Sequence, residues 1–153
     1  MGFKIPESVL VVIHTPDLQV LMIERASHPG FWQSVTGSLD FVGEPLAAAA
    51  IREVAEETGL DATAPGHQLR DWGRSASYEI FPRWRHRYAP GVTRNLEHVF
   101  SLEIPAPRAV RLAPAEHIAQ QWLPQREAAL LAFSHTNRDA ILALSNAPWL
   151  SAG

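Results

Sequence analysis

The stretch Gly37-Ser-Leu-Asp-Phe-Val-Gly-Glu-Pro-Leu-Ala-Ala-Ala-Ala-Ile-Arg-Glu-Val-Ala-Glu-Glu-Thr-Gly-Leu60 decides how this 153-residue chain is organised. It predicts a glycine-containing loop followed by a helix. The helix is expected to begin at Glu44-Pro45, because proline is preorganised for the first helical position. It is expected to end at Gly59, a residue type that favours the position just after a helix. The rest of the chain is therefore interpreted as the surroundings of one loop–helix–loop unit.

Three carboxylates lie on one face of this predicted helix. At about 100° per residue, Glu57 and Glu56 fall about 40° and about 60° to either side of Glu53. Like charges at these spacings destabilise a helix unless a cation lies among them. Carboxylate oxygens are also the ligands that Mg²⁺ and Mn²⁺ prefer. Arg52, four residues before Glu56, can pair with that carboxylate.

A solvated acidic surface is the simpler interpretation of these glutamates. The other face of the same helix argues against it, because it carries an apolar stripe that must pack on a core. This stripe comprises Ala47, Ala50, Ile51 and Val54. The pattern therefore favours a functional, metal-binding face.

Composition narrows the class of protein. Apolar residues make up 46% of the chain and charged residues 19%, values typical of one globular domain with a real core. The net charge of -3 predicts no general attraction to nucleic acid or to an anionic membrane. The chain has no cysteine, which excludes a disulfide framework and is compatible with a reducing cytoplasm. No signal-peptide pattern is present, and the apolar run 8–13 is too short to span a bilayer. We expect a soluble, cytoplasmic protein.

Hydrophobic patterning predicts strands before and after the central helix. Strands are expected at 8–13, 20–25, 31–36, 68–81, 83–88 and 96–104, with the first two forming a hairpin. Residues 117–123 are compatible with either a strand or a helix, whereas 125–133 and 137–145 indicate helices. This order suggests a mixed sheet covered on both faces, an α/β fold.

The opening stretch resembles the Nudix box, G-x5-E-x7-R-E-U-x-E-E-x-G-U, where U is a bulky apolar residue. Every fixed position from Glu44 to Leu60 matches. The front half departs from the pattern, because six residues rather than five separate Gly37 from Glu44. The resemblance implies a single Nudix hydrolase domain over residues 1–153, with an α/β/α sandwich, a mixed central sheet and metal-dependent hydrolysis of a phosphorus-containing anhydride.

Segments outside the box resemble the bacterial dihydroneopterin triphosphate diphosphatases of folate synthesis. The longest is Arg85-His-Arg-Tyr-Ala-Pro-Gly-Val-Thr-Arg-Asn95, and 31–37 and 78–81 continue the match in the same register. The resemblance implies Mg²⁺-dependent hydrolysis of dihydroneopterin triphosphate to the monophosphate and pyrophosphate, with Mn²⁺ as the other candidate metal. One alternative is a housecleaning nucleoside triphosphate pyrophosphatase. Another is a non-catalytic Nudix-fold binding module, which would be expected to lose box glutamates, and none is missing here.

The resemblance also implies the site. The catalytic residues would be Arg52, Glu53, Glu56 and Glu57. The metal ligands would be Glu53, Glu56, Glu57 and Glu116, with Glu97 a competing candidate for the ligand outside the box. The substrate contacts would be Lys4, Arg25, Thr36, Tyr78, Glu79, Ile80, Phe81, Arg85, Arg87, Arg94 and Ser134. The expected partner is a small-molecule triphosphate, bound by a monomer or a small homo-oligomer, with no nucleic acid and no membrane.

Four arginines within residues 83–94 predict an anion site from their own chemistry. Arg83, Arg85 and Arg87 alternate and would share one face of a strand, and Arg94 follows a turn. Guanidinium groups suit phosphate oxygens. A solvated basic edge, or a patch that balances the glutamates, is the alternative. The aromatic residues between the arginines would also suit single-stranded nucleic acid, which the net charge of -3 disfavours.

Overall fold

The computed structural model describes residues 2–146. The strands are β1 (Glu7–His14), β2 (Gln19–Arg25), β3 (Trp32–Gln33), β4 (Val35–Ser38), β5 (Gln68–Glu79), β6 (Arg94–Glu103) and β7 (His117–Pro124). The helices are α1 (Leu46–Thr58), α2 (Gln125–Leu131) and α3 (His135–Ala143), with short 3₁₀ helices η1 (Pro82–Arg87) and η2 (Leu144–Asn146). The α/β architecture expected from the sequence is confirmed.

The strands form one seven-stranded mixed sheet in the order β3-β2-β1-β6-β5, with β4 on β1 and β7 on β2. Strand β1 runs parallel to β6 along its whole length, from Glu7↔Leu96 to His14↔Glu103. The expected hairpin of β1 and β2 exists only at its closed end, where His14 pairs with Val20. Beyond that point β2 pairs with β7, and β4 takes its place beside β1.

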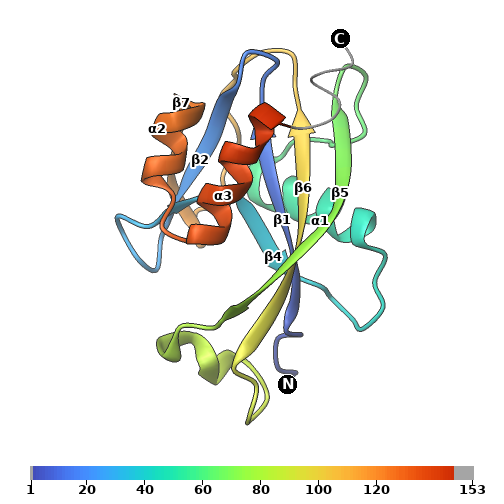
Figure 1. Cartoon of the computed structure of the whole chain (residues 1–153), viewed down its shortest axis with the longest axis vertical. Helices are drawn as coiled ribbons and strands as arrows, with labels where there is room; N and C mark the ends of the chain where they lie inside the picture. The colour runs from blue at the N-terminus through green and yellow to red at the C-terminus, as the bar shows by residue number, and fades with distance from the viewer. Residues whose placement is uncertain (1, 147–153) are drawn as a thin grey trace.

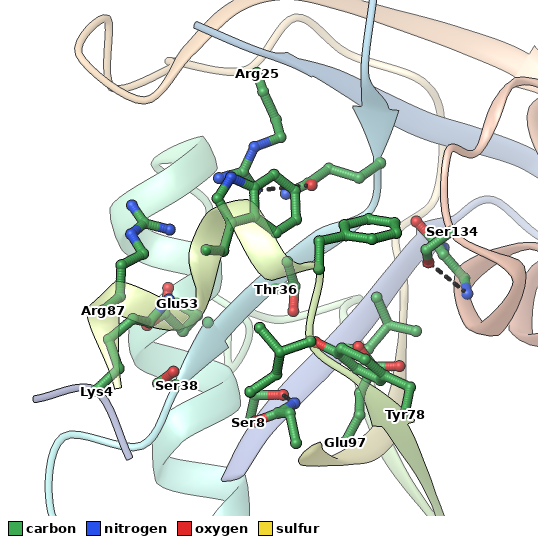
Figure 2. A pocket seen from close by; sticks show the side chains of 18 of the residues that line it. Lys4, Ser8, Arg25, Thr36, Ser38, Glu53, Tyr78, Arg87, Glu97 and Ser134 are labelled. Atoms are coloured by element: carbon green, nitrogen blue, oxygen red, sulfur yellow. Dashed lines mark hydrogen bonds between the residues drawn. The ribbon is translucent and has the colours of Figure 1, made fainter. Parts of the chain in front are cut away.

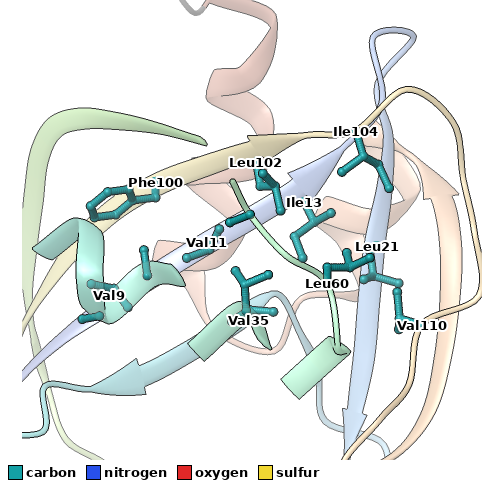
Figure 3. Close-up of a cluster of buried hydrophobic side chains, with 14 of the residues drawn as sticks. Val9, Val11, Ile13, Leu21, Val35, Leu60, Phe100, Leu102, Ile104 and Val110 are labelled. Atoms are coloured by element: carbon teal, nitrogen blue, oxygen red, sulfur yellow. The ribbon is translucent and has the colours of Figure 1, made fainter. Parts of the chain in front are cut away.

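Helices cover both faces of this sheet (Figure 1). Val9, Val11 and Ile13 pack with Ala50 and Val54 of α1 on one face (Figure 3). Alternate residues of the same strand, such as Leu10 and Val12, pack against α2 and α3 on the other. Strand β1 is therefore buried on both sides, as its uninterrupted apolar run predicts.

The ends of α1 follow the local signals, whereas its buried face differs from the prediction. Pro45 is the N-cap, and Gly59 ends the helix in the left-handed conformation with φ 73°. Ala47, expected in the apolar stripe, is exposed. Ala49 is buried instead, so the buried face of the helix differs from the predicted one. This face also includes Glu53 and Glu57.

The predicted strand 31–36 divides at Ser34. Residues before Ser34 pair with β2, and residues after it pair with β1. Ser34 itself is held by α3, since its backbone N–H donates to Asn137 Oδ1 at 2.8 Å and its hydroxyl accepts from Asn137 Nδ2 at 3.0 Å. A distant helix thus breaks a strand that is continuous in sequence.

The predicted strand 83–88 is wrong, because residues 83–87 lie in η1 and Tyr88 forms only an isolated bridge with Lys4. The β5–β6 ladder ends at Glu79↔Arg94, so the following residues have no strand to pair with. Their N–H groups bond locally instead, with Trp84 N–H donating to Phe81 O and Tyr88 N–H donating to Arg85 O, while the Arg87 carbonyl accepts from Lys4 N–H. The alternating arginines consequently do not share a strand face. Residues 117–123, left open between strand and helix, belong to strand β7.

Among residues 2–146, no helix combines the length and apolar character needed to cross a membrane.

Candidate active site

A cavity of about 700 Å³ lies between α1, β4, the N-terminal segment, η1 and the start of α3 (Figure 2). Most of the residues expected in a site line it. They are Lys4, Arg25, Thr36, Glu53, Glu56, Glu57, Tyr78, Glu79, Ile80, Phe81, Arg87, Glu116 and Ser134. Three expected residues do not line it, namely Arg52, Arg85 and Arg94.

Glu53 and Glu57 form the acidic wall of this cavity. Both are buried, with exposed fractions of 8% and 3%. Burial, followed by the charge and hydrogen bond of Glu53, raises the pKa of Glu57 well above its ordinary value. Burial also raises the pKa of Glu53, against the hydrogen bond from Arg52. The charges of the two carboxyl groups repel each other, and a proton shared between them or a bound cation would relieve this repulsion.

Arg52 lies behind the cavity and organises the loop and helix that form this wall. Its Nη1 donates to Glu53 Oε1 at 2.7 Å, and its Nη2 donates to Glu44 Oε1 at 3.0 Å and to the Ser38 carbonyl at 3.2 Å. The predicted pairing with Glu56 is present at 3.6 Å. The box arginine therefore ties the glycine loop to the helix without itself facing the cavity.

The donor set suits a divalent cation, although it is not preassembled. Within residues 2–146, no three carboxylate or histidine side chains converge as metal ligands do. Glu56 turns toward Arg52, with 56% of its side chain exposed, and Glu116 is exposed on the loop before β7. Yet buried Glu57 Oε1 accepts no hydrogen bond from any described residue, and the charge of Glu116 reaches Glu57. A cation would satisfy this oxygen and offset the repulsion among the carboxylates.

Three cations line the cavity together with the acidic wall. Lys4, Arg25 and Arg87 all line it, and Lys4 and Arg87 lie beside Glu53 in Figure 2. Burial and then the charges of Arg87 and Arg25 lower the pKa of Lys4, while Glu53 and Glu57 act in the opposite direction. The Arg25 guanidinium lies 4.8 Å from the centre of the Trp84 ring and donates to Gln33 Oε1 at 3.2 Å. Such a cluster of cations suits a polyphosphate.

Like Arg52, the other two expected arginines that do not line the cavity have structural partners. Arg85 Nε donates to the Ile80 carbonyl at 2.9 Å, and its Nη2 donates to Glu79 Oε1 at 3.1 Å. Arg94 Nε donates to Ser77 Oγ at 3.1 Å. These bonds hold the end of the β5–β6 ribbon and the start of η1, next to the cavity.

The hydroxyl groups expected in the site are also partly engaged. The Thr36 hydroxyl donates to the Val9 carbonyl at 3.0 Å, and the Thr36 backbone bonds Glu57, which favours its charged form. Ser134 is the N-cap of α3 and accepts from the Asn137 N–H at 3.2 Å. Thr36 and Ser134 therefore stabilise the strand and the helix that form the cavity walls, in addition to lining the cavity.

Sequence reasoning missed part of the aromatic wall. Phe81 was expected, but Trp84 and Phe133 line the cavity with it, at ring-centre distances of 5.2 Å from Phe81 to Trp84 and 6.0 Å from Trp84 to Phe133. No local pattern marks Phe133, which reaches the site through the turn between α2 and α3. Asn95, a buried polar residue that lines the cavity two residues before Glu97, was missed too.

Comparison with known proteins places this geometry in a family. The NUDIX domain model matches residues 4–144. The chain is 48% identical over 140 residues to the dihydroneopterin triphosphate diphosphatase of Escherichia coli K12, covering 91% of each protein. It is 39% identical over 142 residues to the Haemophilus influenzae enzyme of the same name, covering 92% of this chain and 88% of that protein.

A solved structure agrees with these sequence relationships. The E. coli dihydroneopterin triphosphate pyrophosphohydrolase superposes with a TM-score of 0.85 at 47% identity, covering 92% of this chain and 95% of that one. The NUDIX match over residues 4–144 includes the whole loop–helix–loop stretch and every residue that lines the cavity except Phe3. The chain therefore belongs to the Nudix family of hydrolases.

Proposed function

We propose that this chain is a Mg²⁺-dependent diphosphatase that converts dihydroneopterin triphosphate to dihydroneopterin monophosphate and pyrophosphate. The observation that carries the proposal is a single cavity lined by Glu53 and Glu57 together with Lys4, Arg25 and Arg87. Carboxylates for a hard cation and cations for phosphate oxygens are what hydrolysis of a phosphoanhydride requires. The relatives in E. coli and H. influenzae support the choice of a pterin substrate.

Glu53, Glu57 and Glu116, with Glu56 close by, would hold the metal. Bound there, Mg²⁺ supplies positive charge at the phosphate oxygens and makes water more acidic. Lys4, Arg25 and Arg87 would bind the phosphate chain and offset the negative charge that develops as the anhydride breaks.

The box residues then take two roles. Arg52 keeps Glu53 in place through the 2.7 Å bond from its Nη1. One of the box glutamates accepts the proton of the attacking water at a carboxylate oxygen.

The proposal treats the chain as one Nudix domain, which the match over residues 4–144 supports. We place the enzyme in the cytoplasm. A chain without cysteine forms no disulfide and therefore needs no oxidising compartment.

Product analysis tests the proposal. The purified chain is incubated with dihydroneopterin triphosphate or with each deoxynucleoside triphosphate, in Mg²⁺ or in chelator, and pyrophosphate and orthophosphate are measured separately. We expect Mg²⁺-dependent release of pyrophosphate, fastest from dihydroneopterin triphosphate and lost in Glu57→Gln. A strong preference for a deoxynucleoside triphosphate would replace the proposal with a housecleaning role. Absence of turnover on every triphosphate, unchanged by Glu57→Gln, would indicate a binding module.

A further inference from the structure

A further acidic residue, Glu97, lines the cavity away from the Glu53–Glu57 pair. Glu97 lies on β6, next to Ser8 of β1 and Ala76 of β5, and is only 4% exposed. Figure 2 shows Glu97 below Tyr78, on the far side of the cavity from Lys4, Arg87 and Glu53. This position is separate from the cations that would bind phosphate.

Glu97 and Asn95 each present one buried oxygen that lacks a hydrogen-bond donor. Both residues are buried on the same face of β6, and Asn95 is 1% exposed. No residue in the range 2–146 donates a hydrogen bond to Glu97 Oε1 or to Asn95 Oδ1. The amide of Asn95 is fixed by the bond from its Nδ2 to Ser8 Oγ at 2.8 Å, which turns its oxygen away from Ser8.

An unsatisfied buried acceptor destabilises a fold, so such atoms call for an explanation. Burial raises the pKa of Glu97 to about 7, and a side-chain hydrogen bond from Thr136 offsets this only in part. The side chain is thus kept in a cavity wall at a cost to stability. A ligand that brings two adjacent donors would remove that cost.

The walls around Glu97 suit a flat ring. Tyr78 lies near Glu97 in Figure 2, and burial, followed by the charge of Glu97, raises the pKa of Tyr78. Leu10, Ile80, Phe81 and Phe133 line the same cavity. An aromatic and aliphatic slot with one carboxylate at its base is a site for a heteroaromatic ring whose edge carries N–H donors.

We propose that Glu97, oriented alongside Asn95, is the specificity-determining residue for the pteridine ring and accepts hydrogen bonds from its N3–H and 2-amino groups. The inference rests on the proposed function and names the ring contact of the same site. A 2-amino-4-oxopteridine carries these two donors side by side, and a carboxylate can accept both. Adenine instead presents one amino donor next to the N1 acceptor, which a carboxylate repels. An amide side chain, with one donor and one acceptor, matches adenine and not the pteridine.

Exchange of this carboxylate for an amide tests the proposal. The wild type, Glu97→Gln and Glu103→Gln are compared for kcat/KM on dihydroneopterin triphosphate and on dATP. Glu103 is a matched control, because it lies on the same strand and pairs with Arg70 outside the cavity. In Glu97→Gln we expect the ratio of pterin to dATP turnover to fall about 10- to 100-fold, the value of one paired contact to a base edge. Glu103→Gln should match the wild type.

Competitive inhibition tests the ring-binding part and the phosphate-binding part of the cavity separately. Dihydroneopterin, which carries no phosphate, should inhibit Glu97→Gln more weakly than the wild type, while inorganic pyrophosphate inhibits both equally. Glu97→Asp keeps the charge but withdraws the carboxylate by one methylene, so it should also weaken dihydroneopterin inhibition. This variant tests the contact even if Glu97→Gln does not fold.

The opposing results are distinct. Equal loss on both substrates, or a changed inhibition constant for pyrophosphate, would assign Glu97 to metal binding or structure and overturn the inference. No change in any ratio would overturn it as well, and both results leave the proposed function standing. Failure of the wild type itself to hydrolyse dihydroneopterin triphosphate would overturn the proposed function instead.

Discussion

The carboxylate of Glu53 occupies the space that a side chain at Gly37 would need. A Cβ built on Gly37 would lie 2.1 Å from Glu53 Cδ and 2.3 and 2.4 Å from its two oxygens. The backbone of Gly37 is not in the left-handed region, so conformational freedom does not explain this glycine. Gly37 is required because β4 and α1 approach closely enough for the acidic side chain to lie directly against the strand backbone.

Gly37→Ala should therefore displace Glu53 while leaving the fold intact. The clashing atoms are the far end of a flexible side chain, which can rotate away. A misplacement of about 1 Å costs on the order of 100-fold in rate, so we expect kcat/KM to fall by that amount with little change in the thermal midpoint. Gly2→Ala is the control, because its added Cβ meets nothing within 4 Å. Full activity in Gly37→Ala would contradict this account.

Local signals predicted the loop–helix–loop unit because they act within a few residues. Pro45 and Gly59 cap α1 where the sequence placed its ends. The alternation of residues 83–88 led to a wrong strand prediction. An alternating segment forms a strand only beside a partner strand, and the β5–β6 ladder stops at Glu79. Ser34 shows the same limit, since the residue that interrupts its strand, Asn137, lies more than one hundred positions away.

The candidate site was predictable to the extent that the family pattern specifies it. The pattern treats Arg85 and Arg87 alike, whereas the structure directs only Arg87 to the cavity. That difference depends on the geometry of η1, which no spacing in the sequence reveals. Glu97 was weighed only as a metal ligand, because its separation from Glu53 becomes visible only when β6 and α1 are placed on the sheet.

The different positions of Arg85 and Arg87 lead to opposite expectations for their alanine variants. Arg87→Ala removes a cation from the cavity and should raise the inhibition constant of pyrophosphate about 10-fold or more, because charge-assisted contacts to phosphate are strong. Arg85→Ala should leave that constant nearly unchanged and lower the thermal midpoint, since it removes bonds to Ile80 O and Glu79. Competitive inhibition and thermal unfolding measure the two effects. Equal pyrophosphate inhibition constants in Arg87→Ala and Arg85→Ala would contradict the assignment of only Arg87 to the phosphate site.

Glu57→Gln should separate stability from metal binding. Wild-type Glu57 is buried beside Glu53, so its charge opposes folding when no cation is bound. At pH 8 in chelator, we expect the variant to melt a few degrees higher, a gain of about 1–2 kcal/mol for a chain of this size. Added Mg²⁺ should raise the midpoint of the wild type and not that of the variant. Exposed Glu127 supplies the control Glu127→Gln, which should retain the Mg²⁺ response. An equal response in Glu57→Gln would exclude Glu57 as a ligand.

Glu97 gives the stability of the fold a pH dependence whose sign follows from its burial. Its pKa rises from an ordinary 4.5 to about 7 in the folded chain. Between these values the folded chain keeps a proton that the unfolded chain has released, so the free energy of unfolding falls as pH rises through this window. The full effect by pH 8 is about 3 kcal/mol.

Glu97→Gln removes this titration and leaves the other acidic groups in place. The variant should therefore gain stability relative to the wild type as pH increases from 5 to 8, with most of the gain between pH 5 and 7. Urea denaturation in chelator at several pH values measures the difference, in which the contributions of Glu53 and Glu57 cancel. A difference that stays constant across this range would mean that Glu97 titrates at its ordinary pKa and is not desolvated in the cavity wall. A growing difference would show that the residue proposed to recognise the ring destabilises the fold, the expected trade-off for a buried binding group.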